Sequence, residues 1–152
     1  MSANIDREDV LAAMRGIDVF KDVPAEAIKT ELLGGLTNRN FRIESPLGRH
    51  VLRIPGAGTS EYINRHNEAH AAKSAARVGV NAEVQHFDEK TGVMLCRYID
   101  GGVTLNAERF KDLGSVRRSA VALRRVHDSA APFLNRFELF QMRERVQPRG
   151  RR

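Results

Sequence analysis

Five short strand-like segments around one long alanine-rich helix place the strongest limit on how this chain can fold. The first three segments lie close together, at residues 28–33, around Phe41 and Ile43, and from Val51 to Ile54. The sequence Ser-Pro-Leu-Gly at residues 45–48 is a favourable turn. Because connections this short favour antiparallel neighbours, the segments predict a β-hairpin preceded by a glycine-rich strand turn.

The helix is expected over residues 60–78. Five alanines within this range favour a helix. Thr59 or Ser60 is the expected N-cap, and Gly79 is expected to end the helix.

Two further strands, at residues 83–87 and 93–99, follow this helix, and helices are expected at residues 6–15 and 107–129. This order predicts an α+β fold with a five-stranded antiparallel sheet and one long helix. One face of the last helix carries Val116, Ala120, Leu123 and His127. Beyond it, Phe133, Phe137 and Phe140 have helical spacing and need a partner.

The excess positive charge is concentrated in one short segment. The chain has 25 Lys and Arg against 19 Asp and Glu, a formal net charge of +6. Residues 143–152 hold five Arg and one Glu, whereas residues 1–142 hold 20 basic and 18 acidic groups. An arginine-rich tail can bind nucleic acid, but a nearly balanced body without aromatic stacking patches argues against a nucleic-acid partner.

Composition excludes several other classes of protein. No run approaches the ~18 apolar residues of a membrane span, so no membrane partner is expected. The first residues lack the basic and apolar regions of a secretory signal. Cys96 is the single cysteine and lies in an apolar run, where an inert buried thiol is expected. These features predict a cytoplasmic protein.

The glycine-rich turn at residues 33–41 is the first candidate binding motif. Gly34 and Gly35 allow the backbone to approach a bound phosphate and to offer its N–H groups. Thr37 and Asn38 add small hydrogen-bond donors. The alternative is an ordinary hairpin turn, since short glycine patterns are weak signals.

Arg53 is the second candidate, because it interrupts an apolar strand. A buried cation is costly without an anionic partner. A phosphate is one possible partner, and Glu68 on the following helix is the best protein candidate. The alternative is that Arg53 points to solvent from an edge strand.

Three weaker patterns are rejected. Residues 56–58 resemble a dinucleotide fingerprint but lack its third glycine. His66 and His70 have zinc-ligand spacing but no third ligand. His127 and Asp128 stand at a helix end, where a packed histidine is the simpler explanation.

Several segments, taken in order, resemble the choline/ethanolamine kinase family, which is close to the aminoglycoside phosphotransferases and thiamine kinases. The resemblance extends over residues 30–140. It is carried by segments 34–41, 51–56, 64–68, 94–101 and 123–127.

The resemblance implies a protein-kinase-like N-terminal lobe that binds ATP. In that lobe the glycine-rich loop covers the phosphates, and Arg53 contacts them while pairing with Glu68. The carbonyl of Arg97 and the amide of Ile99 are implied to hold the adenine. The implied nucleotide-binding residues are Gly34, Gly35, Thr37, Asn38, Asn40, Arg53, Glu68, Arg97 and Ile99.

The chain departs from the family in its catalytic residues. The family resemblance calls for an H-x-D-x-x-x-x-N loop and a further Asp for Mg²⁺. The residue five after Asp128 is Phe133, so this pattern is not met. No catalytic or metal-binding residue is therefore expected in this chain. The base and the Mg²⁺ ligands are expected in a separate C-terminal lobe.

The family reaction moves the γ-phosphoryl group of ATP to a small-molecule alcohol such as choline, ethanolamine or thiamine. This chain is expected to be a truncated form that is inactive by itself. The alternative is a non-catalytic nucleotide-binding or regulatory module. The expected organisation is a helical segment at 1–27, an ATP-binding lobe at 28–101, the start of a truncated helical lobe at 102–142, and a disordered basic tail at 143–152.

Overall fold

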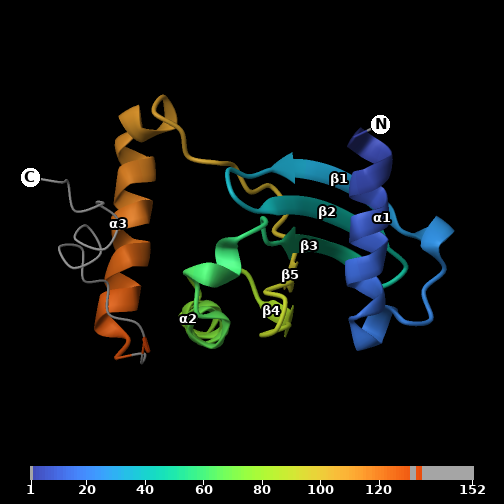
Figure 1. Ribbon diagram of the computed structural model, residues 1–152. Coiled ribbons are helices and arrows are strands. Elements are labelled where there is room, and N and C mark those ends of the chain that lie inside the picture. Colours follow the sequence, from blue (N-terminus) through green and yellow to red (C-terminus); the bar gives the residue numbers. More distant parts are fainter. Residues whose placement is uncertain (1, 131–132, 135–152) are drawn as a thin grey trace, which may run out of the picture.

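A computed structural model describes residues 2–130 and 133–134 of the chain. It contains helices at both ends of the described region and a sheet between them (Figure 1). The α-helices are α1 (Ser2–Arg15), α2 (Arg65–Arg77) and α3 (Leu113–Asp128). The strands are β1 (Lys29–Gly34), β2 (Arg39–Ser45), β3 (Gly48–Ile54), β4 (Val84–Phe87) and β5 (Met94–Arg97). Short 3-10 turns are η1 (Asp18–Phe20), η2 (Ala25–Ala27), η3 (Thr59–Glu61) and η4 (Arg109–Lys111).

The five strands form one antiparallel sheet in the order β1-β2-β3-β5-β4. Its register places Phe41 of β2 beside Leu52 of β3, and Leu52 beside Leu95 of β5. Directly paired residues lie on the same face of a sheet, so these three side chains form one apolar row across its centre. The predicted α+β fold and the hairpin turn at residues 45–48 are confirmed.

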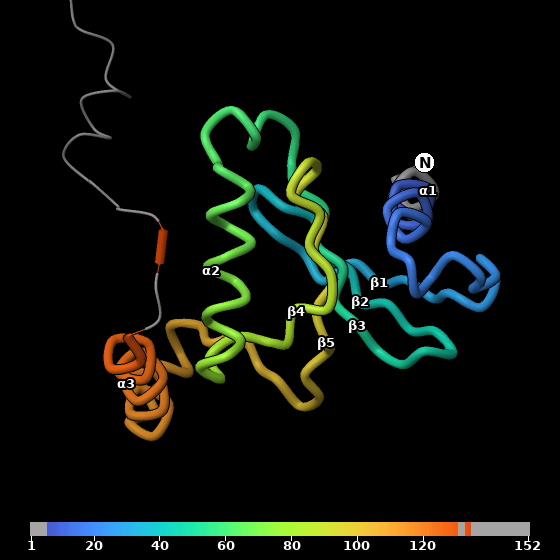
Figure 2. Tube along the Cα trace, turned by 90° about the horizontal axis from the view of Figure 1, so that it is seen from below, coloured from blue at the N-terminus to red at the C-terminus, as the bar shows by residue number. Residues whose placement is uncertain are grey.

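The two faces of the sheet are covered by different helices. α1 lies on one side of the sheet and α2 on the other (Figure 2). The buried hydrophobic cluster joins Val10 and Met14 of α1 to Phe41, Ile43 and Leu52 of the sheet. Ion pairs from Arg39 of β2 to Asp6 (2.9 Å) and Asp9 (2.7 Å) hold α1 against this core.

α2 begins later than residues 60–78 predict, at Arg65. The expected caps, Thr59 and Ser60, belong to η3 instead. The Thr59 hydroxyl donates to the Gly56 carbonyl at 2.8 Å, and Asn64 is the N-cap, accepting from the Asn67 N–H at 3.1 Å. The predicted end is confirmed, because Gly79 takes the left-handed conformation with φ of 76° just after the helix.

Two other helices also differ from the predicted ranges. α1 begins at Ser2 rather than residue 6, and α3 begins at Leu113 rather than residue 107 because Asp112 caps its first N–H groups. The predicted apolar face of α3 is exposed, with Val116 40% and Leu123 61% accessible. The prediction that His127 is packed is wrong, because this residue is exposed as well.

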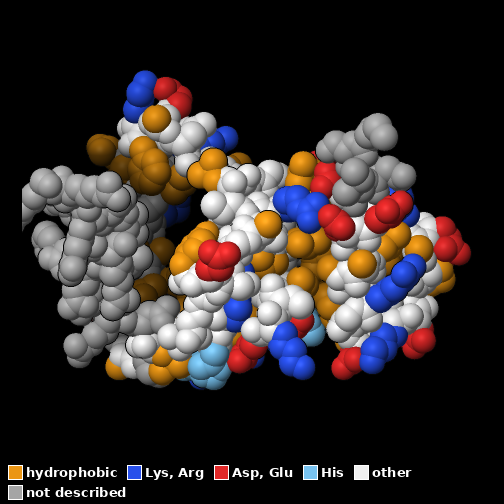
Figure 3. Space-filling model, in the orientation of Figure 1, with side chains coloured by type: hydrophobic (Ala, Val, Ile, Leu, Met, Phe, Trp, Pro, Cys, Tyr) orange, Lys and Arg blue, Asp and Glu red, His pale blue; other side chains and the backbone are white. Residues whose placement is uncertain are grey.

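Charged side chains of both signs are mixed around α1 on the face shown in Figure 3, as the nearly balanced composition of residues 1–142 predicts. Within the described part of the chain, no helix has the length and apolar character needed to cross a membrane. Phe137, Phe140 and the basic tail at residues 143–152 lie outside the described residues.

Candidate functional site

Arg53 and Glu68 form a largely buried ion pair between the sheet and α2. Arg53 Nη2 lies 2.7 Å from Glu68 Oε1, and the two side chains are 17% and 20% exposed. Side chains alternate between the faces of a strand, so Leu52 points to the α1 core while Arg53 points to α2. The predicted partner of Arg53 is confirmed, and the prediction that it points to solvent is wrong.

A second arginine contacts the same carboxylate. Arg65, the first residue of α2, places Nη1 2.7 Å from Glu68 Oε2, and its side chain is 6% exposed. Arg65 Nη2 also donates to the Thr59 hydroxyl at 2.5 Å. Sequence reasoning missed this role, although the three-residue spacing of Arg65 and Glu68 on a helix was a usable signal.

This cluster of Arg53, Arg65 and Glu68 carries two positive charges and one negative charge. Charges in a poorly solvated site interact more strongly than charges in water, so the net positive charge favours an anion. Within the described chain, the buried Nε of Arg53 has no hydrogen-bond partner. The cluster therefore offers both a charge and a free donor to a bound anion.

The glycine-rich turn between β1 and β2 has a conformation that requires glycine. Gly34 and Gly35 have φ of 103° and 147°, and a Cβ added at Gly35 would lie 1.8 Å from the Asn38 carbonyl oxygen. Asn40 Nδ2 donates to the Gly34 carbonyl at 3.0 Å, so its side chain fixes the shape of the turn. Asn38 Oδ1 is buried without a hydrogen-bond partner in the described residues.

The tip of this turn lies over the segment that follows β3. A Cβ added at Gly56 would lie 2.0 Å from the Thr37 carbonyl oxygen, so the two backbones are in direct contact. Gly56 comes three residues after Arg53. The fold thus brings the glycine-rich turn and the end of strand β3, which carries Arg53, to one place.

Arg97 and Ile99 lie at and just beyond the end of β5, away from the charge cluster. Arg97 is three residues along β5 from Met94, which pairs with Arg53, a distance of roughly 10 Å along a strand. The Arg97 N–H donates to the Glu83 carbonyl at 2.9 Å, and its side chain pairs with Glu83 at 2.6 Å. Ile99 is 59% exposed.

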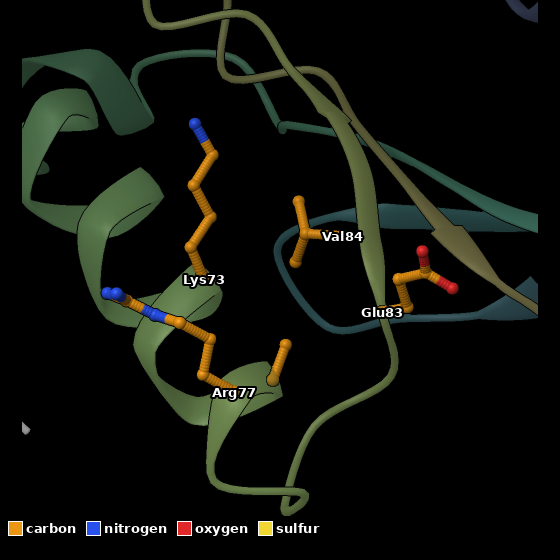
Figure 4. A pocket seen from close by; sticks show the side chains of 5 residues that line it. Lys73, Arg77, Glu83 and Val84 are labelled. Atoms are coloured by element: carbon orange, nitrogen blue, oxygen red, sulfur yellow. The ribbon is translucent and has the colours of Figure 1, made fainter.

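A hollow of about 540 Å³ lies between the C-terminal half of α2 and β4. Lys73 and Arg77 project from the helix, Val84 points toward it, and Glu83 points away (Figure 4). Lys73 and Arg77 are exposed, so this hollow has no buried charged group comparable to Arg53. The cluster of Arg53, Arg65 and Glu68 is therefore the stronger candidate for an anion-binding site.

The remaining candidates from the sequence behave as ordinary structural residues. Burial raises the pKa of the Cys96 thiol, which is 5% exposed, as expected for an inert cysteine. His66 Nδ1 pairs with Glu89 at 2.9 Å. Among the described residues, no three His, Cys, Asp or Glu side chains gather to hold a metal ion.

Comparison with known proteins gives a consistent set of relatives, although no protein-family model matches the chain. Protein LicA of Haemophilus influenzae is 33% identical over 123 residues, which are 81% of this chain and 36% of that protein. A choline/ethanolamine kinase family protein from Mesorhizobium loti has a TM-score of 0.76 at 43% identity, over 95% of this chain and 45% of that one. LicA in complex with AMP has a TM-score of 0.65 at 25% identity, over 78% of this chain and 41% of that one. The chain thus spans less than half the length of each of these proteins.

The antiparallel sheet, the helix packed on it and the ion pair between them define the class, which is the N-terminal lobe of the protein-kinase-like fold. Within this class, the chain is similar to choline/ethanolamine kinase family proteins, including LicA, and matches their N-terminal part. The family resemblance inferred from the sequence is confirmed.

Proposed function

We propose that this chain is the ATP-binding part of a choline/ethanolamine-kinase-like phosphotransferase. The observation that carries the proposal is the ion pair between Arg53 on β3 and Glu68 on α2 beside a glycine-rich turn. In this proposal Arg53 contacts the phosphates with a fixed charge and a planar set of donors. Backbone N–H groups around Gly34, Gly35, Thr37 and Asn38 cover the phosphates, and Asn40 holds the loop in shape.

The adenine is proposed to bind at the end of β5, with the carbonyl of Arg97 and the amide of Ile99 as its backbone partners. The complex of LicA with AMP supports this assignment at the level of nucleotide binding by a relative. In this proposal the base and the phosphates bind at two places separated along β5. The base lies at the end of the strand near Arg97, and the phosphates lie near Arg53, which pairs with Met94.

The reaction proposed for the complete enzyme is transfer of the γ-phosphoryl group from ATP to an alcohol such as choline, ethanolamine or thiamine. This chain binds and orients the nucleotide, and catalysis of this type is mainly positioning and charge neutralisation. The sequence contains no H-x-D-x-x-x-x-N pattern. No group of three His, Cys, Asp or Glu side chains that could hold a metal ion occurs among the described residues. The base and the Mg²⁺ ligands are proposed to lie in a separate lobe.

Nucleotide binding is tested by titration calorimetry and thermal unfolding with Mg-ATP. Ligand at 100 times its Kd stabilises the folded state by about 2.7 kcal/mol, which raises the Tm of a chain this size by roughly 5–10 °C. Arg53→Ala is expected to weaken ATP binding about 30-fold or more. Arg49→Ala is the matched control, because Arg49 lies on the same strand and pairs with exposed Asp100. Equal stabilisation of the wild type and Arg53→Ala by ATP would contradict the phosphate role.

Phosphoryl transfer is tested by incubating the purified chain with Mg-ATP and choline, ethanolamine or thiamine. The expected result is no phosphorylated product above the enzyme-free rate. Robust turnover by this chain would contradict the assignment of the catalytic base to a separate lobe.

A further inference from the structure

Arg65 is the most buried Lys, Arg, Asp or Glu residue among those whose burial is described. A guanidinium this buried is unfavourable unless its donors are occupied. Two of its nitrogens contact Glu68 and Thr59, whereas its buried Nε has no hydrogen-bond partner among the described residues. Gly92 closes over the group, since a Cβ there would lie 2.7 Å from Arg65 Nε. Arg65 is therefore a fixed part of the structure.

A continuous set of contacts leads from the glycine-rich turn to the ion pair through Arg65. The Thr37 carbonyl touches Gly56, and the Gly56 carbonyl accepts from the Thr59 hydroxyl at 2.8 Å. That hydroxyl accepts from Arg65, and Arg65 holds Glu68. Arg65 thus connects the loop segment to the carboxylate that pairs with Arg53.

Glu68 divides its two oxygens between the arginines. Oε1 faces Arg53 and Oε2 faces Arg65, each at 2.7 Å. A carboxylate with both oxygens available forms a two-bond fork with a single arginine. Arg65 engages Oε2 and so competes with Arg53 for this oxygen, while the buried Nε of Arg53 has no hydrogen-bond partner among the described residues.

We propose that Arg65 is a positioning residue of the nucleotide site. By engaging one oxygen of Glu68, it holds the ion pair with Arg53 to the other oxygen and leaves donors of Arg53 for the phosphates of the nucleotide. This inference rests on the proposed ATP-binding function. It assigns Arg65 no direct contact with the nucleotide.

The test compares the affinities for ATP and for adenosine, which lacks phosphates, in the wild type and in Arg65→Met. The variant is expected to bind ATP about tenfold more weakly, as for loss of a charge-assisted hydrogen bond, and to bind adenosine as the wild type does. Arg65→Lys keeps a cation beside Glu68 and is expected to recover part of the ATP affinity. Arg77→Met is the matched control, because Arg77 lies on α2 outside the cluster and is exposed.

A merely structural role would reduce the fraction of folded protein and would not change the ratio of ATP to adenosine affinity per folded molecule. An unchanged ratio in Arg65→Met therefore overturns the positioning role and leaves the proposed function standing. If Arg65→Met does not fold, Arg65→Lys and Thr59→Val carry the test, and an unchanged ratio in both overturns the role. A wild-type chain that binds no ATP overturns both proposals.

Discussion

The two faces of the sheet differ in chemistry, although side chains of the same strands alternate between them: the face toward α1 is apolar and the face toward α2 carries buried charges. On the α1 face, Phe41, Leu52 and Leu95 are at most 2% exposed and pack into a continuous apolar core. On the α2 face, the residue next to Leu52 is Arg53, which lies in a cluster of three charged groups. The α1 face stabilises the lobe. The charges on the α2 face are expected to stabilise it no more than well-packed hydrophobic side chains of similar volume would. This difference is what the proposed nucleotide-binding role of the α2 face requires.

The largest expected effect is a loss of stability caused by a substitution in the apolar core on the α1 face. Phe41→Ala removes a large side chain from the centre of the core and is expected to lower the free energy of unfolding by about 3–5 kcal/mol. Because Phe41 points away from α2, ATP affinity per folded molecule is expected to remain unchanged. Urea unfolding and calorimetry measure the two quantities. A large change in ATP affinity would show that the core on the α1 face also determines nucleotide binding on the α2 face.

The next effect comes from removing the shared carboxylate on the α2 face. Glu68→Ala leaves Arg53 and Arg65 without a counter-charge and is expected to cost about 3 kcal/mol of stability. The triple variant Arg53→Met, Arg65→Met, Glu68→Leu is the sharper comparison. It is expected to recover the stability lost in Glu68→Ala while abolishing ATP binding. A triple variant as unstable as Glu68→Ala would mean that the cluster is needed for folding.

A smaller effect is expected at the contact between the glycine-rich turn and the end of β3. Gly56→Ala places a methyl group against the Thr37 carbonyl and is expected to cost about 1–3 kcal/mol through overpacking. It also moves the turn away from Arg53, so ATP affinity is expected to fall while adenosine affinity is retained. Gly16→Ala, after α1, is the control, with a nearest contact of 3.3 Å. Equal effects of the two substitutions on ATP affinity would count against contact between the turn and the site.

The smallest effect is a pH dependence on the α1 face. Burial lowers the pKa of His50 below its ordinary value of 6.5, so the unfolded chain binds a proton more readily than the folded one. Stability is therefore expected to fall as the pH drops through about 6.5 toward the lowered value. His50→Gln should flatten the slope of the unfolding free energy in this range. An unchanged slope would assign the dependence to another group.

A separate loss of stability is expected at more acidic pH. Asp18, Asp88 and Asp112 have a pKa held below 3.8 by hydrogen bonds from Lys21, Thr91 and Ser115 respectively. These contributions are present above about pH 3.8 and are lost as the pH falls further.

The strands and the Arg53–Glu68 pair could be predicted from the sequence because their signals are local or chemically restrictive. Turn residues at 45–48 fix a hairpin, and a cation in an apolar strand requires an anion. The start of α2 could not be predicted this way, since Thr59 is a good cap by type. Its hydroxyl is used by Gly56 and Arg65 instead, and that choice depends on the tertiary structure.

The missed residue and the unpacked helix have a similar explanation. In the sequence, Arg65 cannot be distinguished from any other arginine in the first turn of a helix. Its burial depends on contacts with Glu68 and Gly92 that form only in the folded chain. On α3, the spacing of Val116 and Leu123 identifies an apolar face, but spacing carries no information about what covers that face. Local pattern predicts which side chains share a face, and only the assembled fold defines their neighbours.

The bulge at the end of β1 has a consequence for behaviour at high protein concentration. β1 is an edge strand of the sheet, and its Leu32 and Leu33 are 53% and 47% exposed. An exposed apolar edge can recruit a strand from another molecule and start aggregation. Here the register shifts between Leu32 and Gly34, so the edge bends before it can offer a long straight row of N–H and C=O groups. The bulge beside the glycine-rich turn therefore opposes edge-to-edge pairing between molecules at β1.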